Sequence, residues 1–133
     1  MYGDNLVKLD VRPLIQFHRE RGAVATMALM ESPEPWTGGV VETDAAGRVR
    51  SFVEKPPREQ ATSKLINAGI LVLEPVVLEA IPAGQFCDFG RDVIPRLIAE
   101  GRPVFARQPA AYIQDIGTPE RLAKARADFE RGL

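Results

Sequence analysis

The chain has 133 residues, a length that fits one domain and is short for two. Hydrophobic residues make up 45% and charged residues 26%, which is typical of a globular domain and excludes a disordered segment. With 17 basic and 18 acidic residues the net charge is -1, which argues against nucleic acid as a partner, and one cysteine excludes an internal disulfide. No uncharged apolar run approaches the roughly 20 residues of a membrane span, so we expect a single cytoplasmic domain with no membrane partner.

The first half of the chain predicts a helix followed by three strands. Asp10 is a candidate cap for a helix over about 10–21, with Pro13 tolerated in its first turn. The nearly unbroken apolar run 24–30 is typical of a strand covered on both faces. Residues 40–42 and 49–53 flank the turn sequence Asp44–Gly47, which predicts a hairpin.

The second half continues the alternation. We expect a strand over 66–73, a short helix from Pro75, a helix that Asp88 caps and that runs to Gly101, and short strands over 104–106 and 111–113. Thr118 as cap and Pro119 at the first position predict a last helix over about 118–131, with an apolar stripe of Leu122, Ala125 and Phe129. We expect this helix and the helix over about 10–21 to cover the sheet. Alternating strands and helices indicate an α/β layered domain. The opening residues 1–5 are interpreted as the end of a strand.

Two aspartates stand where open α/β sheets commonly bind ligands. Asp4 would follow the end of the opening strand, and Asp115 precedes the helix capped by Thr118. Gly-Asp-Asn is also a common turn, and helix capping explains Asp115 equally well. Two carboxylates from distant positions could share a hard cation such as Mg²⁺, which prefers oxygen ligands.

Three further positions invite a functional interpretation. Glu54 and Lys55 end the hairpin, although such a pair is more often a solvated surface pair. Asn67 lies inside an apolar run, so it is either satisfied structurally or directed at a polar ligand. Gly69 and Gly39 would let a backbone or a ligand approach closely.

Taken in order, these segments resemble the sugar-1-phosphate nucleotidyltransferase family. The resemblance rests on the spacing of six segments along nearly the whole chain: Gly3-Asp4-Asn5, Gly39-Val40-Val41-Glu42, Asp44 to Val49, Phe52 to Pro56, Asn67-Ala68-Gly69-Ile70 and Asp115 to Pro119. It implies an incomplete Rossmann-like three-layer α/β/α sandwich with a mixed sheet, one domain over residues 1–133, and a reaction in which a sugar 1-phosphate attacks the α-phosphorus of a nucleoside triphosphate.

The resemblance also implies roles for single residues. Asp4 and Asp115 would be Mg²⁺ ligands and, with Lys55, the catalytic residues. Glu54 would bind sugar hydroxyls, and Lys55 would contact the sugar phosphate. Gly39, Asn67 and Gly69 would shape the sugar pocket.

The sequence departs from the family pattern in one respect. Family members open with a Gly-rich loop of the type GGxGTRLxPLT, and the 133 residues contain none. We therefore expect the sugar-phosphate- and metal-binding portion of the enzyme, inactive alone, with self-association or a partner chain along an exposed sheet edge. The alternative is a non-catalytic sugar-phosphate-binding or scaffold domain. The joint presence of Asp4, Lys55, Asn67 and Asp115 favours the first hypothesis.

Overall fold

The computed structural model describes residues 1–132, and its main element is a mixed five-stranded sheet. The strands of this sheet lie in the order β4-β3-β5-β2-β6, with β2 and β6 parallel and the other neighbours antiparallel. Their bounds are Ala25–Glu31 (β2), Gly39–Thr43 (β3), Val49–Glu54 (β4), Leu65–Leu73 (β5) and Val104–Arg107 (β6). The predicted hairpin and the predicted strand over 66–73 are confirmed.

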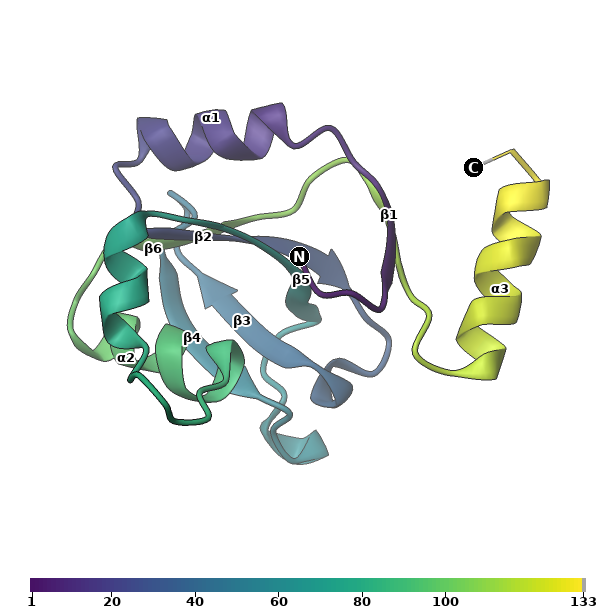
Figure 1. The fold of residues 1–133 in the computed structure, drawn as a ribbon. Coiled ribbons are helices and arrows are strands. Elements are labelled where there is room, and N and C mark those ends of the chain that lie inside the picture. The colour runs from purple at the N-terminus through teal and green to yellow at the C-terminus, as the bar shows by residue number, and fades with distance from the viewer. Residues whose placement is uncertain (133) are drawn as a thin grey trace.

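Helices cover both faces of this sheet, which gives three layers (Figure 1). Strand β2 is buried on both sides, as its apolar run predicts, so Met27 faces one core and Ala28 the other. Helix α1, Arg12–Glu20, adds Leu14 to the core of Ala28. Helix α2, Ile94–Ala99, adds Ile94 and Leu97 to the core of Met27. The expected α/β/α sandwich with a mixed sheet is confirmed.

The start of α1 differs from the prediction. Its N-cap residue is Val11, which has no capping side chain. Asp10 instead accepts hydrogen bonds from the backbone N–H of Arg12, at 3.0 Å, and from the Arg12 guanidinium. Asp10 thus forms an Asx-type turn just before the helix. At the buried end of α1, His18 contacts Thr26 Oγ1 at 2.8 Å and Glu74 Oε1 at 3.1 Å, so its ring holds the helix to the sheet.

Short helical turns connect the remaining elements. They are η1, Pro35–Thr37, η2, Arg58–Gln60, η3, Pro75–Ala80, and the π-helical turn η4, Phe89–Val93, which leads into α2. Asp88 caps η4 as predicted, because its Oδ1 accepts a hydrogen bond of 2.8 Å from the N–H of Arg91. Among residues 1–132, none of the helices combines the length and the apolar character needed to cross a bilayer.

A separate two-stranded sheet joins the two ends of the chain. It pairs β1, Asn5–Lys8, with β7, Tyr112–Asp115, in antiparallel register. The expectation that residues 1–5 end a strand is therefore wrong: Asp4 lies just before β1. The residue types of these five positions alone do not distinguish the beginning of a strand from its end.

The last helix also departs from one expectation. Helix α3, Pro119–Glu130, begins at the predicted cap, where Thr118 Oγ1 accepts a hydrogen bond from the N–H of Arg121. It does not cover the five-stranded sheet but lies to one side of it, after β7 (Figure 1). Of its predicted apolar stripe only Ala125 is buried, and Phe129 is 72% exposed. Polar contacts with β7 hold α3 instead, since Asp128 accepts a hydrogen bond from Tyr112 and Arg121 pairs with Asp115.

Candidate functional site

The pairing of β1 with β7 brings the two predicted metal ligands together. Asn5 lies opposite Asp115, and the N–H of Ile116 donates a 2.8 Å hydrogen bond to the carbonyl oxygen of Asp4. A Cβ placed on Gly117 would lie 3.1 Å from Asp115 Oδ1 and 3.6 Å from Asp4 Oδ2. The two carboxylate oxygens therefore flank the same glycine, and their separation cannot exceed the sum of those distances.

Asp115 already has two partners. Its Oδ1 accepts a 2.7 Å hydrogen bond from the N–H of Gly117, and its Oδ2 forms an ion pair of 2.6 Å with Nη1 of Arg121. Arg121 comes from the first turn of α3, so the position of that helix controls the charge beside the carboxylates. Reasoning from the sequence missed Arg121. The available signal was that Arg121 follows Asp115 by six residues. Because the helix starts at Pro119, its first turn brings Arg121 back into contact with Asp115.

The donor set fits a magnesium ion. Carboxylate oxygens are hard ligands, and Mg²⁺ commonly binds through one or two carboxylates while it keeps waters or substrate phosphates. Within residues 1–132 no cluster of three or more His, Cys, Asp or Glu side chains could enclose a metal. Asp4 and Asp115 would thus hold the ion through two ligands only, and a site of that kind leaves coordination positions open.

Glu54 forms the second part of the site, at the end of β4. Burial raises the pKa of its carboxyl above the usual range, the nearby Asp88 carboxylate raises it further, and the charges of Lys55 and Arg91 act in the opposite direction. Glycines make room for this carboxylate. A Cβ on Gly39 or on Gly90 would lie 2.7 Å from Glu54 Oε2.

Lys55 follows Glu54 in an uncommon backbone conformation. Its φ is +46°, the only positive value among the non-glycine residues that the structure describes, and its N–H donates a 2.9 Å hydrogen bond to the carbonyl of Gly38. A left-handed conformation costs a lysine about 1–2 kcal/mol. Backbone strain of this kind clusters at functional sites, and the turn directs the chain out of the sheet next to Gly39.

Asn67 and Gly69 are occupied by neighbouring protein groups. Asn67 Oδ1 accepts a 3.0 Å hydrogen bond from the N–H of Gly69. Gly69 has a φ of +72°, and a Cβ there would lie 2.6 Å from Asn5 Nδ2 and 2.8 Å from the Tyr2 ring. The close approach expected at Gly69 is therefore made by Tyr2 and Asn5.

Tyr2 connects the two parts of the site. Burial raises the pKa of its phenol, and the negative charges of Asp88, Glu54 and Asp4 raise it further, while the nearby Asn67 side chain acts to lower it. The phenol thus lies within electrostatic range of both the Glu54 side and the Asp4 side. Sequence reasoning missed Tyr2 as a site residue and treated Asp88 only as a helix cap. The available signal was that Tyr2 directly precedes Gly3-Asp4.

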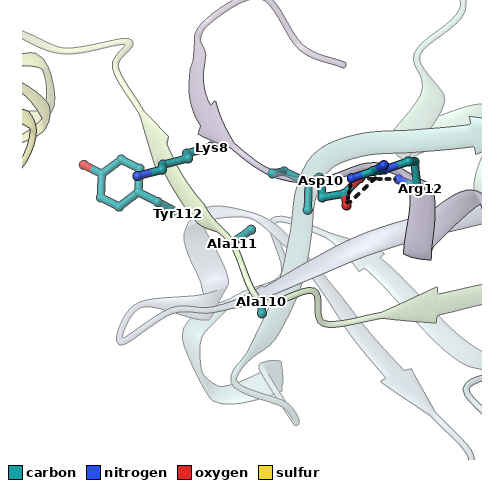
Figure 2. Close-up of a pocket in the computed structure, with 7 residues that line it drawn as sticks. Lys8, Asp10, Arg12, Ala110, Ala111 and Tyr112 are labelled. Carbon is teal, nitrogen blue, oxygen red and sulfur yellow. Dashed lines mark hydrogen bonds and ion pairs between the residues drawn. The ribbon is translucent and has the colours of Figure 1, made fainter. Parts of the chain in front are cut away.

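An open groove lies at the opposite end of β1. It is lined by Lys8, Leu9, Asp10, Arg12 and residues 110–112. Figure 2 shows the Asp10–Arg12 ion pair on one side of it and Lys8 with Tyr112 on the other. Since Lys8 and Asn5 stand at opposite ends of the strand, this groove is separate from the carboxylate pair.

The chain belongs to the nucleotidyl transferase family, whose sequence profile matches residues 1–132. Two curated relatives support this family assignment. The chain is 42% identical over 117 residues to a UTP–glucose-1-phosphate uridylyltransferase from Synechocystis sp., covering 86% of this chain and 30% of that one. It is 38% identical over 135 residues to a mannose-1-phosphate guanylyltransferase from Mycobacterium tuberculosis, covering 98% and 36% respectively. The chain thus spans about a third of the length of these relatives.

Solved structures match the fold. HddC from Yersinia pseudotuberculosis superposes with a TM-score of 0.74 at 27% identity, over 96% of this chain and 52% of that one. An apo UDP-glucose pyrophosphorylase gives a TM-score of 0.77 at 22% identity, over 98% and 53%. A Bacillus anthracis protein solved in complex with sucrose gives 0.81 at 20% identity, over 98% and 53%. The predicted family and the predicted Rossmann-like fold are both confirmed.

Proposed function

We propose that the chain is the sugar-1-phosphate- and metal-binding portion of a nucleotidyltransferase. In this reaction a phosphate oxygen of the sugar 1-phosphate attacks the α-phosphorus of a nucleoside triphosphate. A new P–O bond forms, the bond between the α-phosphorus and the bridging oxygen to the β-phosphate breaks, and pyrophosphate leaves with the electron pair. The observation that carries the proposal is the meeting of Asp4 and Asp115 beside Gly117, together with relatives named for this class of reaction.

Each residue of the site has a defined part in the proposal. Asp4 and Asp115 hold Mg²⁺, which when bound offsets the charge of the two anionic substrates. Lys55 supplies a fixed positive charge for the phosphate of the sugar, and Glu54 accepts hydrogen bonds from sugar hydroxyls. Gly39 gives Glu54 the space to take up that position, because any Cβ there would overlap the carboxylate. Asn67 and Gly69 shape the sugar pocket through the backbone conformation of β5.

The domain would also associate along a strand edge. Within residues 1–132, β1 and β7 pair only with each other, so each has an outer edge without a strand partner there. Such edges are commonly covered in native proteins. We expect a second copy or a partner chain along the β1–β7 sheet. Light scattering tests this, and a strictly monomeric species at all concentrations would contradict it.

Ligand titration of the 133-residue chain tests the proposed function. Glucose 1-phosphate and mannose 1-phosphate are added in Mg²⁺ and, separately, in excess chelator, and heat is recorded. We expect weak binding of at least one sugar phosphate that the chelator abolishes. A chain that binds neither compound in Mg²⁺ would contradict the proposal.

A pyrophosphate-release assay with the four common nucleoside triphosphates separates binding from catalysis. Removing one preorganised charge-stabilising donor costs roughly 10²- to 10³-fold in rate. These 133 residues contain no Gly-rich phosphate loop, so we expect no detectable transfer from this polypeptide. Turnover would show that other residues do the work of that loop.

A further inference from the structure

The guanidinium of Arg121 uses only part of its hydrogen-bonding capacity. Its Nη1 donates a 2.6 Å hydrogen bond to Asp115 Oδ2, and among residues 1–132 this side chain makes no other hydrogen bond. A guanidinium carries five N–H donors in a planar fork. Nε and Nη2 of Arg121 therefore have no partner in the part of the chain that the structure describes.

Arg12 shows the arrangement that Arg121 does not adopt. Arg12 binds Asp10 with two groups, Nε at 2.9 Å and Nη2 at 2.8 Å, so that edge of its fork is fully used. Asp115 instead gives one oxygen to Arg121, while its Oδ1 accepts a 2.7 Å hydrogen bond from the N–H of Gly117. The edge that Arg12 spends on a carboxylate is thus available in Arg121.

Arg121 lies beside the proposed metal site. Oδ1 of Asp115 and Oδ2 of Asp4 both flank the position of a Cβ on Gly117, at 3.1 Å and 3.6 Å. An ion held between these two oxygens would contact Oδ1 of Asp115, whereas Arg121 contacts Oδ2 of the same carboxylate. The guanidinium and the ion would then share one carboxylate through its two oxygens.

Exposure and charge suit this place to a phosphate. The side chains of Arg121 and Asp115 are 45% and 42% exposed, so a dissolved ligand can reach them, and a pair this exposed adds little to stability. Without a cation, Asp4 and Asp115 outweigh the single guanidinium and repel an anion. A bound divalent cation reverses that balance. The planar fork of an arginine matches two oxygens of one phosphate group.

We propose that Arg121 is a substrate-binding residue: with Nη1 anchored on Asp115, its Nε and Nη2 donate hydrogen bonds to a substrate phosphate next to the metal ion. This inference rests on the metal site of the proposed function. It places a second fixed positive charge on the metal side of the site, in addition to Lys55 on the sugar side. The phosphate belongs either to the sugar 1-phosphate or to the pyrophosphate part of the nucleotide, which offer the same oxygens.

The test compares Arg121→Gln with the matched control Arg12→Gln in the full 133-residue chain. Calorimetry in excess Mg²⁺ measures the binding of glucose 1-phosphate or mannose 1-phosphate in one arm and of inorganic pyrophosphate in the other. Hydrogen bonds to charged groups correspond to roughly tenfold or more in affinity. We expect Arg121→Gln to raise the dissociation constant by about that factor in at least one arm, which identifies the source of the phosphate. Arg12→Gln should stay within twofold in both.

Two readouts separate binding by Arg121 from a structural effect on α3. Arg121→Gln should bind Mn²⁺ alone several-fold more tightly while it binds the phosphate more weakly, whereas a displaced helix would weaken both. By NMR, the Nε–H signal of Arg121, assigned by its loss in Arg121→Gln, should shift when the phosphate is added to the Mg²⁺-loaded chain. The Nε–H signal of Arg12 should not shift, because Asp10 already occupies that group.

Each outcome has one meaning. Phosphate affinities that Arg121→Gln leaves within twofold in both arms, parallel losses of Mn²⁺ and phosphate affinity, or an equal loss in Arg12→Gln would overturn the role of Arg121 and leave the proposed function standing. Pyrophosphate binding that depends on Arg121, in a chain that binds neither sugar phosphate, would overturn the proposed function and support the role of Arg121. An unmodified chain that binds no phosphate compound in Mg²⁺ would overturn both.

Discussion

Asn5 lies directly opposite Asp115 in the antiparallel pair of β1 and β7. Residues 110 positions apart in the sequence therefore share one short ladder, and the residue before Asn5 contributes its carboxylate to the same place as Asp115. The bond from the Ile116 N–H to the Asp4 carbonyl extends the ladder by one further step. A two-stranded sheet is marginal alone, so this geometry depends on the packing of its neighbours.

Removing either carboxylate should weaken metal binding. We expect Asp4→Asn and Asp115→Asn each to raise the dissociation constant for Mn²⁺, measured by electron paramagnetic resonance, by on the order of tenfold or more, because ligand charge sets affinity for hard cations. Asp10→Asn is the matched control at the other end of β1, where the carboxylate pairs with Arg12. Equal affinities for all four proteins would exclude a shared ion between Asp4 and Asp115.

Arg121 should weaken the binding of a metal ion by Asp115. Its guanidinium lies 2.6 Å from Asp115 Oδ2 and neutralises a charge that a cation would use. We expect Arg121→Gln to tighten Mn²⁺ binding several-fold. Arg96→Gln, which breaks a similar exposed pair with Glu100 on α2, should leave the affinity unchanged. Weaker binding in Arg121→Gln would mean that Arg121 orients Asp115 rather than competing for it.

Glu54 should lower stability at neutral pH. Burial raises the pKa of its carboxyl in the folded protein, and Asp88 adds to this, so ionised Glu54 is penalised on folding. The penalty is fully present above the folded pKa and disappears as the pH falls to the ordinary value of a glutamic acid. Glu54→Gln should therefore raise the thermal midpoint at pH 7 but not at pH 3.5, while sugar phosphate binding weakens. A lower midpoint at pH 7 would contradict this assignment.

Alanine substitutions at two glycines with nearly the same φ distinguish the cost of backbone strain from the cost of a steric clash. Gly69 and Gly84 have φ values of +72° and +71°, but only Gly69 has neighbours within 4 Å of a built Cβ. Gly84→Ala should cost roughly 1–2 kcal/mol of unfolding free energy from the left-handed conformation alone. Gly69→Ala should cost about 1–3 kcal/mol more, because the methyl group meets Tyr2 and Asn5. Equal losses of unfolding free energy for the two variants, measured by urea unfolding, would show that Tyr2 and Asn5 do not fill the space beside Gly69.

Local patterns predicted most of the elements. The buried strand over 25–31 follows from an apolar run, the hairpin from its turn residues, and the start of α3 from Thr118 and Pro119. Each of these signals is contained within a few neighbouring residues. The failures came where the outcome depends on distant partners. Whether residues 1–5 begin or end a strand was decided by β7, which lies more than a hundred residues away.

For the site, too, residues recognisable from local motifs were predicted, whereas residues that depend on tertiary contacts were not. Asp4, Glu54, Lys55 and Asp115 were selected by their residue types in an ordered set of motifs, and the structure brings Asp4 and Asp115 to one point. Tyr2 and Arg121 were missed because their contacts arise from tertiary packing. The placement of α3 was also not predicted, because its apolar residues indicated burial. In the structure Asp128 instead bonds Tyr112 of β7, and Phe129 stays exposed.

Chemical-shift mapping tests the central claim most directly. The ¹⁵N-labelled chain is titrated first with Mg²⁺ and then with mannose 1-phosphate or glucose 1-phosphate. The account predicts that Mg²⁺ shifts the amides of residues 3–5 and 115–117, and that the sugar phosphate shifts those of residues 39, 54–55 and 67–69. Shifts centred on the groove at Lys8, Arg12 and Tyr112, or none at all, would contradict it.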